Sequence, residues 1–344
     1  MLTVKVLPAN CGDSIIISFR DKDTIKNILV DGGVGRFYKT RLQHEIEEIK
    51  NKGQNIDLLI VTHVDNDHIN GIIKLIEDDE NNGCIKEVWF NSWTNFGHKP
   101  IKLKHEGKEI TAKSSANLEK ALGNLGIWNN EIIGQGIYRK YDRAKITIVS
   151  PNEPQLENLR GYLDEEFPIS ESDDRKKSID SLQKRKFIEN AKIPNGSSIA
   201  FVFEYYKDEQ TKRLLFLGDS FPSVVVDGLE KMNFISDNKK LEVEYVKLSH
   251  HGSRENTSDE LIKVIKCNNY IVTTKGCHNH PNKETFARIL KYHKPLNIFF
   301  NHKTKQTENI FFPTELTDYE IKQNYIEENW NQDKNFEPYV IKVC

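Results

Sequence analysis

The chain has 344 residues, of which 37% are hydrophobic and 29% charged, and its formal net charge is -2. These values are typical of a globular protein with one large or two ordinary domains. The near-neutral charge excludes a molecule-wide field that would attract nucleic acid or anionic lipid, so any polyanion site must be local. The apolar runs fall far short of the roughly 20 residues of a membrane-spanning helix, and the N-terminus lacks the layout of a secretory signal. We therefore expect a cytoplasmic protein without a membrane segment.

The cysteines are odd in number and widely scattered, at Cys11, Cys84, Cys267, Cys277 and Cys344. A disulfide framework normally shows an even number of cysteines at closer, regular spacing. We therefore expect reduced thiols.

Hydrophobic periodicity alternates between strand and helix along the chain. Residues 2–7, 14–19 and 27–30 predict a strand meander, 40–50 an amphipathic helix, and 56–61 a strand buried on both faces. Further strands are predicted at 85–90, 145–149, 198–205, 213–217, 241–248, 270–273 and 296–300, and helices at 69–76, 115–125, 223–231, 258–266 and 283–292. The charge-rich residues 154–191 indicate an insertion or a mobile segment. The alternation predicts an α/β architecture with two sheets between helices.

Four potential metal ligands follow the strand at 56–61, in the sequence His63-Val64-Asp65-Asn66-Asp67-His68. Imidazole and carboxylate groups clustered at the end of a strand can hold a divalent ion at the edge of a sheet. Without a metal, burying four such groups would be costly. The motif therefore predicts a metal site.

Three other predicted strands also end in groups that can bind metal. Asp219 follows the strand at 213–217, His250 and His251 follow 241–248, and the segment Cys277-His278-Asn279-His280-Pro281 follows 270–273. Because loops at strand ends commonly carry catalytic residues, we expect these side chains to meet the first motif.

These motifs resemble those of the metallo-β-lactamase-fold hydrolase superfamily. More narrowly, they are similar to the branch typified by the hydrolase domain of the DNA-uptake protein ComEC and by phosphorylcholine esterases, which residues 11–15 and 195–199 also resemble. The resemblance implies a metallo-β-lactamase-like four-layer αβ/βα sandwich. It places a hydrolase domain at residues 1–305, a charged insertion at about 154–191 and a C-terminal extension at 306–344.

The resemblance further implies two divalent ions, zinc or manganese. His63 and Asp65 would bind the first and Asp67 and His68 the second, with Asp219 bridging them; His251 and His280 would complete the two sites. The superfamily more often has His where Asp65 stands, and the usual third-motif His is missing near residue 196. A carboxylate is a harder ligand and favours manganese or magnesium over zinc.

A hydroxide between two such ions would be the nucleophile. Asp67 could orient it, and His250 could donate to a phosphoryl oxygen or protonate the leaving group. His251 is favoured over His250 as a ligand, and His280 over His278. Supporting or substrate-near roles are expected for Asp13, Asn195, Ser197, Ser198 and Ser253. Asp31 and Gly32 are interpreted as turn residues.

The implied function is a phosphodiesterase or nuclease. One alternative is a hydrolase of a small ester, lactone or phosphorylcholine-type substrate. Another is an assembly or sensor subunit that binds a protein partner, as in anti-phage defence systems. Basic residues at 99–108, 184–186 and 303–305, with the aromatic residues Trp89, Trp93 and Phe96, could bind nucleic acid. Interleaved acidic residues favour an ordinary solvated surface instead. The sequence does not predict an oligomeric state.

Overall fold

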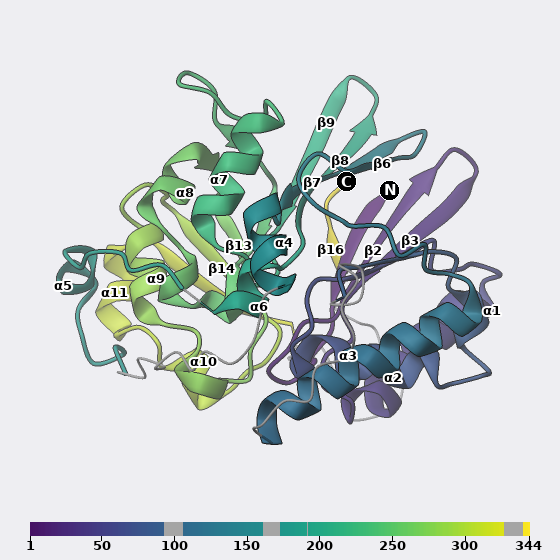
Figure 1. The fold of residues 1–344 in the computed structure, drawn as a ribbon. Coiled ribbons are helices and arrows are strands. Elements are labelled where there is room, and N and C mark those ends of the chain that lie inside the picture. The colour runs from purple at the N-terminus through teal and green to yellow at the C-terminus, as the bar shows by residue number, and fades with distance from the viewer. Residues whose placement is uncertain (93–105, 161–172, 191, 327–339) are drawn as a thin grey trace.

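Two mixed β-sheets face each other in the computed structural model, and helices cover their outer faces (Figure 1). The structure describes residues 1–92, 106–160, 173–190, 192–326 and 340–344. Within these residues the first sheet has the order β16 (Val340–Lys342), β1 (Leu2–Val6), β2 (Ile15–Asp21), β3 (Thr24–Val30), β4 (Leu58–Val61) and β5 (Val88–Phe90).

The second sheet has the order β15 (Ile321–Tyr325), β14 (Leu296–Phe300), β13 (Asn269–Val272), β11 (Tyr245–Lys247), β9 (Gln210–Phe216), β8 (Ala200–Lys207), β7 (Ala144–Ser150) and β6 (Tyr138–Lys140). From β15 to β9 neighbouring strands are parallel, and from β9 to β6 they are antiparallel. A separate short parallel pair joins β10 (Leu241–Glu242) to β12 (Ile265–Lys266).

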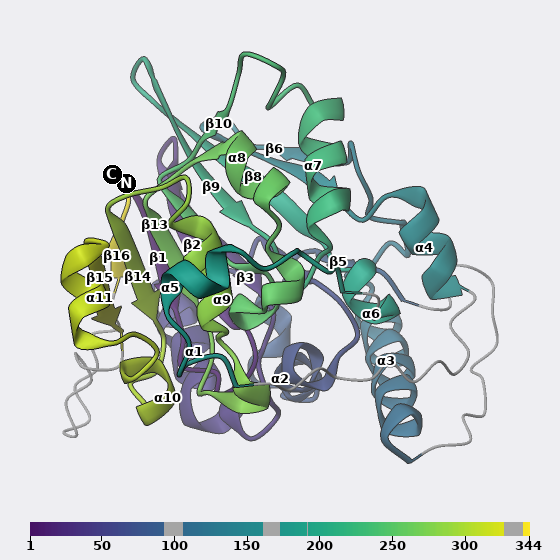
Figure 2. The same cartoon turned by 90° about the vertical axis from the view of Figure 1, so that its left-hand side faces the viewer.

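Helices lie on both outer faces (Figure 1), and Figure 2 looks onto those that cover the second sheet. The first sheet is covered by α1 (Gln43–Asn51), α2 (Asn66–Ile76) and α3 (Glu106–Leu125). The second is covered by α5 (Ile179–Gln183), α7 (Pro222–Lys231), α8 (Asp259–Val264), α9 (Lys283–Ile289) and α11 (Pro313–Asp318). The remaining short helices are α4 (Glu153–Arg160), α6 (Ile193–Gly196) and α10 (Lys305–Glu308).

Alternation along the strands divides the core into three layers. In β4, Leu58 and Ile60 pack between the two sheets, whereas Leu59 and Val61 pack under the helices of the first sheet. In β8, Phe201 and Phe203 point between the sheets, and Ala200 and Val202 point towards the helices of the second. Because successive strand residues face opposite sides, strands that are apolar throughout can be buried on both faces.

The predicted meander at 2–30 is confirmed by the antiparallel strands β1, β2 and β3. The strand predicted at 241–248 is two strands, because β10 pairs with β12 whereas β11 lies between β9 and β13. The helix predicted at 258–266 ends at Val264, where the chain enters β12. Residues 93–105, which include Trp93, Phe96 and most of the first basic cluster, lie outside the described residues.

Residues 173–190 pack against the second half of the chain. Ile179 and Leu182 are buried in the core beside α9, and the Asp174 carboxylate accepts hydrogen bonds from the backbone N–H groups of Lys283 and Glu284 at 3.0 and 2.9 Å. The prediction of a mobile segment at 154–191 is therefore wrong for residues 173–190. Beyond residue 305, β15 and β16 extend the second and first sheets, respectively.

The expectation of reduced thiols is wrong for one pair, because Cys11 and Cys277 form a disulfide with their Cα atoms 5.8 Å apart. The two cysteines are 266 residues apart in sequence, and only the fold brings the loop after β1 to the loop after β13. Cys84, Cys267 and Cys344 are free. Within the described residues, no helix is long and apolar enough to cross a membrane.

Candidate metal centre

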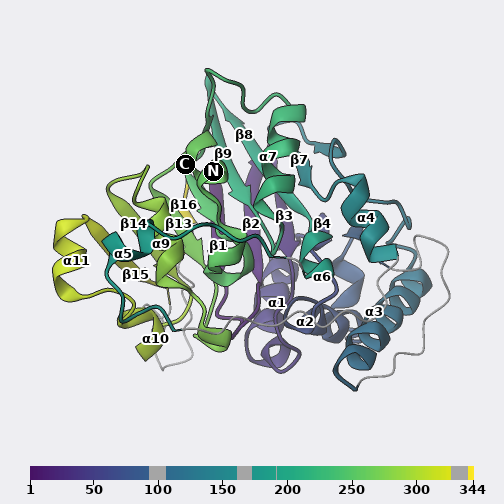
Figure 3. The same ribbon diagram turned by 60° about the vertical axis from the view of Figure 1, so that its left-hand side comes forward.

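The candidate ligands come together where parallel strands of the two sheets end. His63 and Asp65 follow β4, Asp67 and His68 lie in the first turn of α2, Asp219 follows β9, and His250 and His251 follow β11. Asp65 and Lys192, the residues just before α2 and α6, contact each other here, and Figure 3 shows α6 above α2.

Asp219 lies at the middle of the cluster. Its Oδ2 atom is 3.5 Å from His63 Nε2, 3.7 Å from His68 Nε2 and 3.9 Å from His250 Nε2. On the other side, His251 Nε2 is 3.3 Å from Asp67 Oδ2. The ligand atoms of His63, His68 and Asp219 all lie within 4.8 Å of one another, as do those of Asp67, His68 and His251. Two neighbouring sets of candidate ligands therefore share His68.

Polar atoms at the centre of the cluster are buried without a hydrogen-bond partner. They are Nε2 of His63, Nε2 of His68 and Oδ1 of Asp219. Leaving such groups unsatisfied costs about 1 to 3 kcal/mol each, and more when they are charged. Divalent ions would satisfy all three atoms at once, so these residues fit a metal centre.

Outer hydrogen bonds direct the imidazole Nε2 atoms inwards. His68 Nδ1 contacts Asp31 Oδ2 at 2.8 Å, His63 Nδ1 contacts Thr62 Oγ1 at 3.0 Å, and His251 Nδ1 contacts the Thr273 carbonyl at 2.8 Å. Contacts of this kind fix the tautomer and orientation of metal-binding histidines. Asp31, interpreted from sequence as a turn residue, therefore also supports the centre.

The carboxylates and imidazoles shift one another's protonation. Burial alone would raise the pKa of Asp219, but the imidazoles of His68, His250 and His251 hold it well below its usual range. Burial alone would lower the pKa of His68, but Asp219, Asp31 and Asp67 raise it well above its ordinary value. The imidazoles therefore supply positive charge among the carboxylates, a role that bound divalent ions would take over.

His250 and His251 occupy a strained turn that points both rings into the cluster. Their φ angles are 45° and 56°, in the left-handed region that residues other than glycine rarely adopt. Strain of this kind costs of order 1 to 3 kcal/mol per residue and is common at functional sites. The turn brings His250 Nε2 to 3.9 Å from Asp219 Oδ2 and His251 Nε2 to 3.3 Å from Asp67 Oδ2.

His250 is held through its Nδ1 atom. This atom lies 3.1 Å from Asn256 Oδ1, 3.2 Å from Asn195 Nδ2 and 3.3 Å from Asn190 Nδ2. Burial lowers the pKa of His250 to about 4, so the ring is neutral at pH 7. In the tautomer whose Nδ1–H donates to Asn256 Oδ1, the Nε2 lone pair of His250 faces Asp219.

His280 lies beside this cluster and not within either set of three ligands. Its ring centroid is 4.9 Å from that of His250, and its buried Nδ1 atom has no hydrogen-bond partner. Burial, reinforced by the neighbouring His250 and His251, holds the pKa of His280 well below its usual range. Cys277 is bonded to Cys11 and its thiolate is not offered to a metal.

Three of the five expected supporting residues contact the cluster. Ser198 Oγ accepts the Asp219 backbone N–H at 3.0 Å, and Asn195 contacts His250. Asp13 forms a buried ion pair with Lys247 and lies 3.6 Å from His251 Nδ1. Ser197 and Ser253 instead make local bonds, to the Pro194 carbonyl and to the Glu255 N–H, respectively.

Residues that the motifs did not indicate also contribute. Lys192 pairs with Asp65, Asn190 and Asn256 hold His250, and Lys247 neutralises Asp13. Lys247 ends the strand just before His250 and His251, so its position in the sequence could have indicated a residue near the site. The contact of Lys192 with Asp65 spans 127 positions of sequence and leaves no local pattern.

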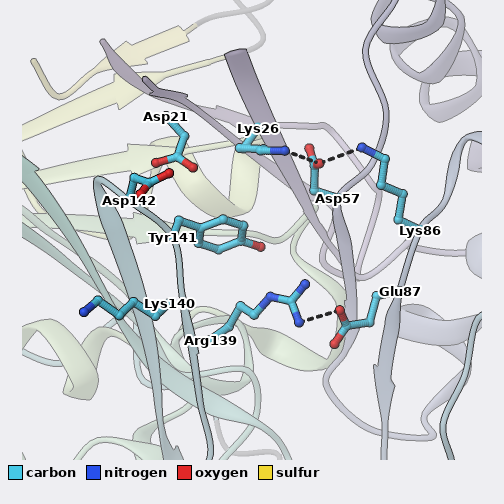
Figure 4. Close-up of a pocket in the computed structure, with 9 residues that line it drawn as sticks. All are labelled: Asp21, Lys26, Asp57, Lys86, Glu87, Arg139, Lys140, Tyr141 and Asp142. Atoms are coloured by element: carbon cyan, nitrogen blue, oxygen red, sulfur yellow. Dashed lines mark hydrogen bonds and ion pairs between the residues drawn. The ribbon is translucent and has the colours of Figure 1, made fainter. Parts of the chain in front are cut away.

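A cavity of about 900 Å³ lies at the opposite edge of the sheets, near the starts of β4 and β5 (Figure 4). Its charges are largely satisfied within it, because Lys26 and Lys86 both contact Asp57 and Arg139 contacts Glu87. Trp89 lies between the sheets, 6% exposed, and its indole N–H donates to Glu87 at 3.0 Å. It therefore cannot serve as an exposed surface for base stacking.

Comparison with known proteins agrees with this geometry. A model of the metallo-beta-lactamase superfamily matches residues 21–273, a range that includes His63 to His68, Asp219, His250 and His251. The predicted metallo-β-lactamase-like sandwich is thereby confirmed. No curated protein matches the sequence.

Solved structures of class B3 metallo-beta-lactamases are similar at low identity. One, described as a B3 enzyme with an active-site glutamic acid, is 12% identical, with a TM-score of 0.33 over 82% of this chain and 88% of that chain. SMB-1, bound to 2-mercaptoethanesulfonate, is 11% identical, with a TM-score of 0.34 over 84% and 93%. LRA-12, a di-zinc enzyme from an Alaskan soil metagenome, is 11% identical, with a TM-score of 0.30 over 67% and 75%.

Proposed function

The chain belongs to the metallo-beta-lactamase superfamily and carries the His and Asp cluster of a metal-dependent hydrolase, and we propose that it hydrolyses phosphodiesters, with nucleic acid as the substrate class. The observation that carries the proposal is the group of buried, unpartnered atoms on His63, His68 and Asp219. Together with Asp67 and His251, these atoms suit two neighbouring divalent ions, zinc or manganese.

His68 lies close to both groups of ligand atoms; we assign it to one ion only, so that Asp219 joins the two sets of proposed ligands. His63, Asp65 and His250 surround one side, and Asp67, His68 and His251 the other. In this assignment His250 takes the position left open by the missing third-motif His. Its ring is neutral at pH 7, and in the tautomer that donates from Nδ1 to Asn256 its Nε2 lone pair can bind a metal. His280 would then support His250 by ring contact.

Two bound divalent ions would supply a hydroxide nucleophile at neutral pH and clamp the attacking and leaving oxygens of a phosphodiester. Asp67 contacts His251 and lies a third exposed, so its carboxylate can orient the attacking group from the open side. Asp31, Thr62 and Thr273 hold the imidazoles in place. Pre-organisation of this kind avoids a reorganisation cost during the reaction.

Two further features support a phosphodiester over a neutral ester. Asp65 adds a hard oxygen ligand to the cluster, and an ammonium group, Lys192, lies against it at the half-exposed rim. The resemblance to the ComEC hydrolase domain and to phosphorylcholine esterases points to the same substrate class. A cluster rich in carboxylates next to a cation suits an anionic substrate bound through metal.

The proposal is tested by turnover of bis(p-nitrophenyl) phosphate, single-stranded DNA and RNA with manganese, zinc or magnesium. We expect Asp219→Asn to lower kcat/KM at least about a hundredfold, since removing a ligand should cost more than removing an outer hydrogen-bond partner. Asp227→Asn, at an α7 ion pair with Lys231, is the matched control and should retain activity. Turnover of p-nitrophenyl acetate without any phosphodiester turnover would contradict the proposal and favour the small-ester alternative.

A further inference from the structure

Lys192 is a cation at the edge of the metal centre that no motif assigns. Its Nζ atom lies 2.7 Å from Asp65 Oδ2, and Asp65 is the only described residue with which this ammonium forms an ion pair. An ordinary lysine side chain has a pKa of about 10.4 and carries a positive charge at neutral pH. A lysine has three N–H donors, and this contact uses one of them.

The backbone of Lys192 is fixed although its side chain is half-exposed. Its N–H donates to Asn190 Oδ1 at 2.7 Å, and its carbonyl accepts the Gly196 N–H at 3.1 Å at the start of α6. Asn190 and Asn195, on either side, both contact His250. Residues 190 and 192–195 therefore position His250 and also place the Lys192 ammonium group at the exposed side of the metal centre.

A second ion pair near the cluster, between Lys247 and Asp13, differs from this one in its exposure. The side chains of Lys247 and Asp13 are 1% and 2% exposed, so that pair is enclosed and its ammonium is out of reach of any substrate. The side chains of Lys192 and Asp65 are 46% and 17% exposed. The ammonium of Lys192 can therefore be reached by a ligand from solvent, whereas that of Lys247 cannot.

We propose that Lys192 binds an anionic oxygen of the substrate while the metal centre holds the reacting group. The inference rests on the proposed function and narrows the substrate class, because the substrate must carry a negatively charged group close to Asp65. The ammonium can contact a phosphoryl oxygen without leaving Asp65, through its remaining N–H groups. Charge-assisted contacts of this kind are stronger than neutral hydrogen bonds.

Binding of inorganic phosphate to the metal-loaded protein tests this inference without turnover. By calorimetry we expect Lys192→Met to weaken phosphate binding at least tenfold and Lys192→Arg to retain most of it. Lys207→Met, at an exposed lysine at the end of β8, should bind as the wild type does. The metal content of each variant is measured in parallel. Unchanged phosphate binding in Lys192→Met, or loss of metal from it, would overturn the inference.

A second readout separates this inference from the proposed function. The ratio of kcat/KM for bis(p-nitrophenyl) phosphate to that for p-nitrophenyl acetate should fall at least tenfold in Lys192→Met. An equal fall for both substrates would mean that Lys192 acts through Asp65 and would overturn the inference. If the wild type turns over no phosphodiester but binds phosphate in a Lys192-dependent way, the anion site stands and the proposed phosphodiesterase function fails.

Discussion

Asp31 combines a backbone role and a chemical role at one position. Its φ of 56° places it in the left-handed region, and its carboxylate accepts hydrogen bonds from Thr62 N–H, Thr62 Oγ1 and His68 Nδ1. Asparagine tolerates this backbone conformation well, so Asp31→Asn removes the charge while keeping the turn. The variant therefore isolates the effect of the carboxylate on His68.

We expect Asp31→Asn to weaken metal binding about 10- to 100-fold, as loss of an outer carboxylate partner typically does. Competition with a chromophoric chelator measures the affinity. Asp208→Asn is a matched control, because Asp208 has a φ of 53° in the exposed turn between β8 and β9. Equal metal affinity in Asp31→Asn and wild type would show that the Asp31 carboxylate does not support metal binding through His68.

The residues of the centre were predictable where they form a dense local motif. His63 to His68, Asp219 and His251 each follow an apolar strand, and the structure brings them together. Lys192, Asn190 and Asn256 could not be found this way, because their contacts depend on which loops the fold places side by side. His250 was predicted at the site, but its position next to Asp219 depends on a left-handed turn that no pattern signalled.

The N-terminal loop and the start of α2 approach each other very closely. A Cβ atom added to Gly12 would lie 1.6 Å from the backbone oxygen of Asp67. We expect Gly12→Ala to displace one of the two segments, costing about 2 kcal/mol or more in the free energy of unfolding and reducing metal content. Gly83→Ala, where the added methyl meets nothing within 4 Å, is the control and should change stability by less than about 0.5 kcal/mol. Urea unfolding with metal analysis measures both, and wild-type values for Gly12→Ala would refute the packing described.

The segment 173–190 is attached to α9 through Asp174. Its carboxylate accepts two backbone N–H groups at the start of that helix, and it is 2% exposed. Asp174→Ala leaves both groups without this partner, so we expect a loss of about 1 to 2 kcal/mol in the free energy of unfolding. Asp173→Ala changes the neighbouring carboxylate, which is 49% exposed, and should have little effect. Urea titration compares the two, and similar stabilities would argue against anchoring at Asp174.

Strands and helices with strong periodicity were predicted well, and weak or non-local elements were not. The apolar strands β4 and β8 and the amphipathic helix α1 matched their sequence patterns. The strand β16 has three residues and is defined by pairing with β1 at the other end of the chain. The helix α5 lies in a charge-rich stretch, yet Ile179 and Leu182 bury it in the core. Tertiary packing outweighed local composition in both cases.

At the scale of the whole molecule, the two sheets bring loops from distant parts of the sequence together at the same end of their strands. Loops after β4, β9 and β11 deliver the candidate ligands, while the ion pairs and cavity near the starts of β4 and β5 lie at the other edge. Three layers of apolar side chains hold this arrangement. The candidate metal ligands therefore lie at one end of the apolar core, and the ion-paired cavity lies at the other.

The most direct test is the number of divalent ions bound per chain, measured by inductively coupled plasma mass spectrometry after dialysis against zinc or manganese. The structure predicts about two ions per wild-type chain and a clear loss in Asp219→Asn, because Asp219 lies between both sets of ligands. Only trace metal in the wild type, or an undiminished content in Asp219→Asn, would contradict a metal centre organised around Asp219.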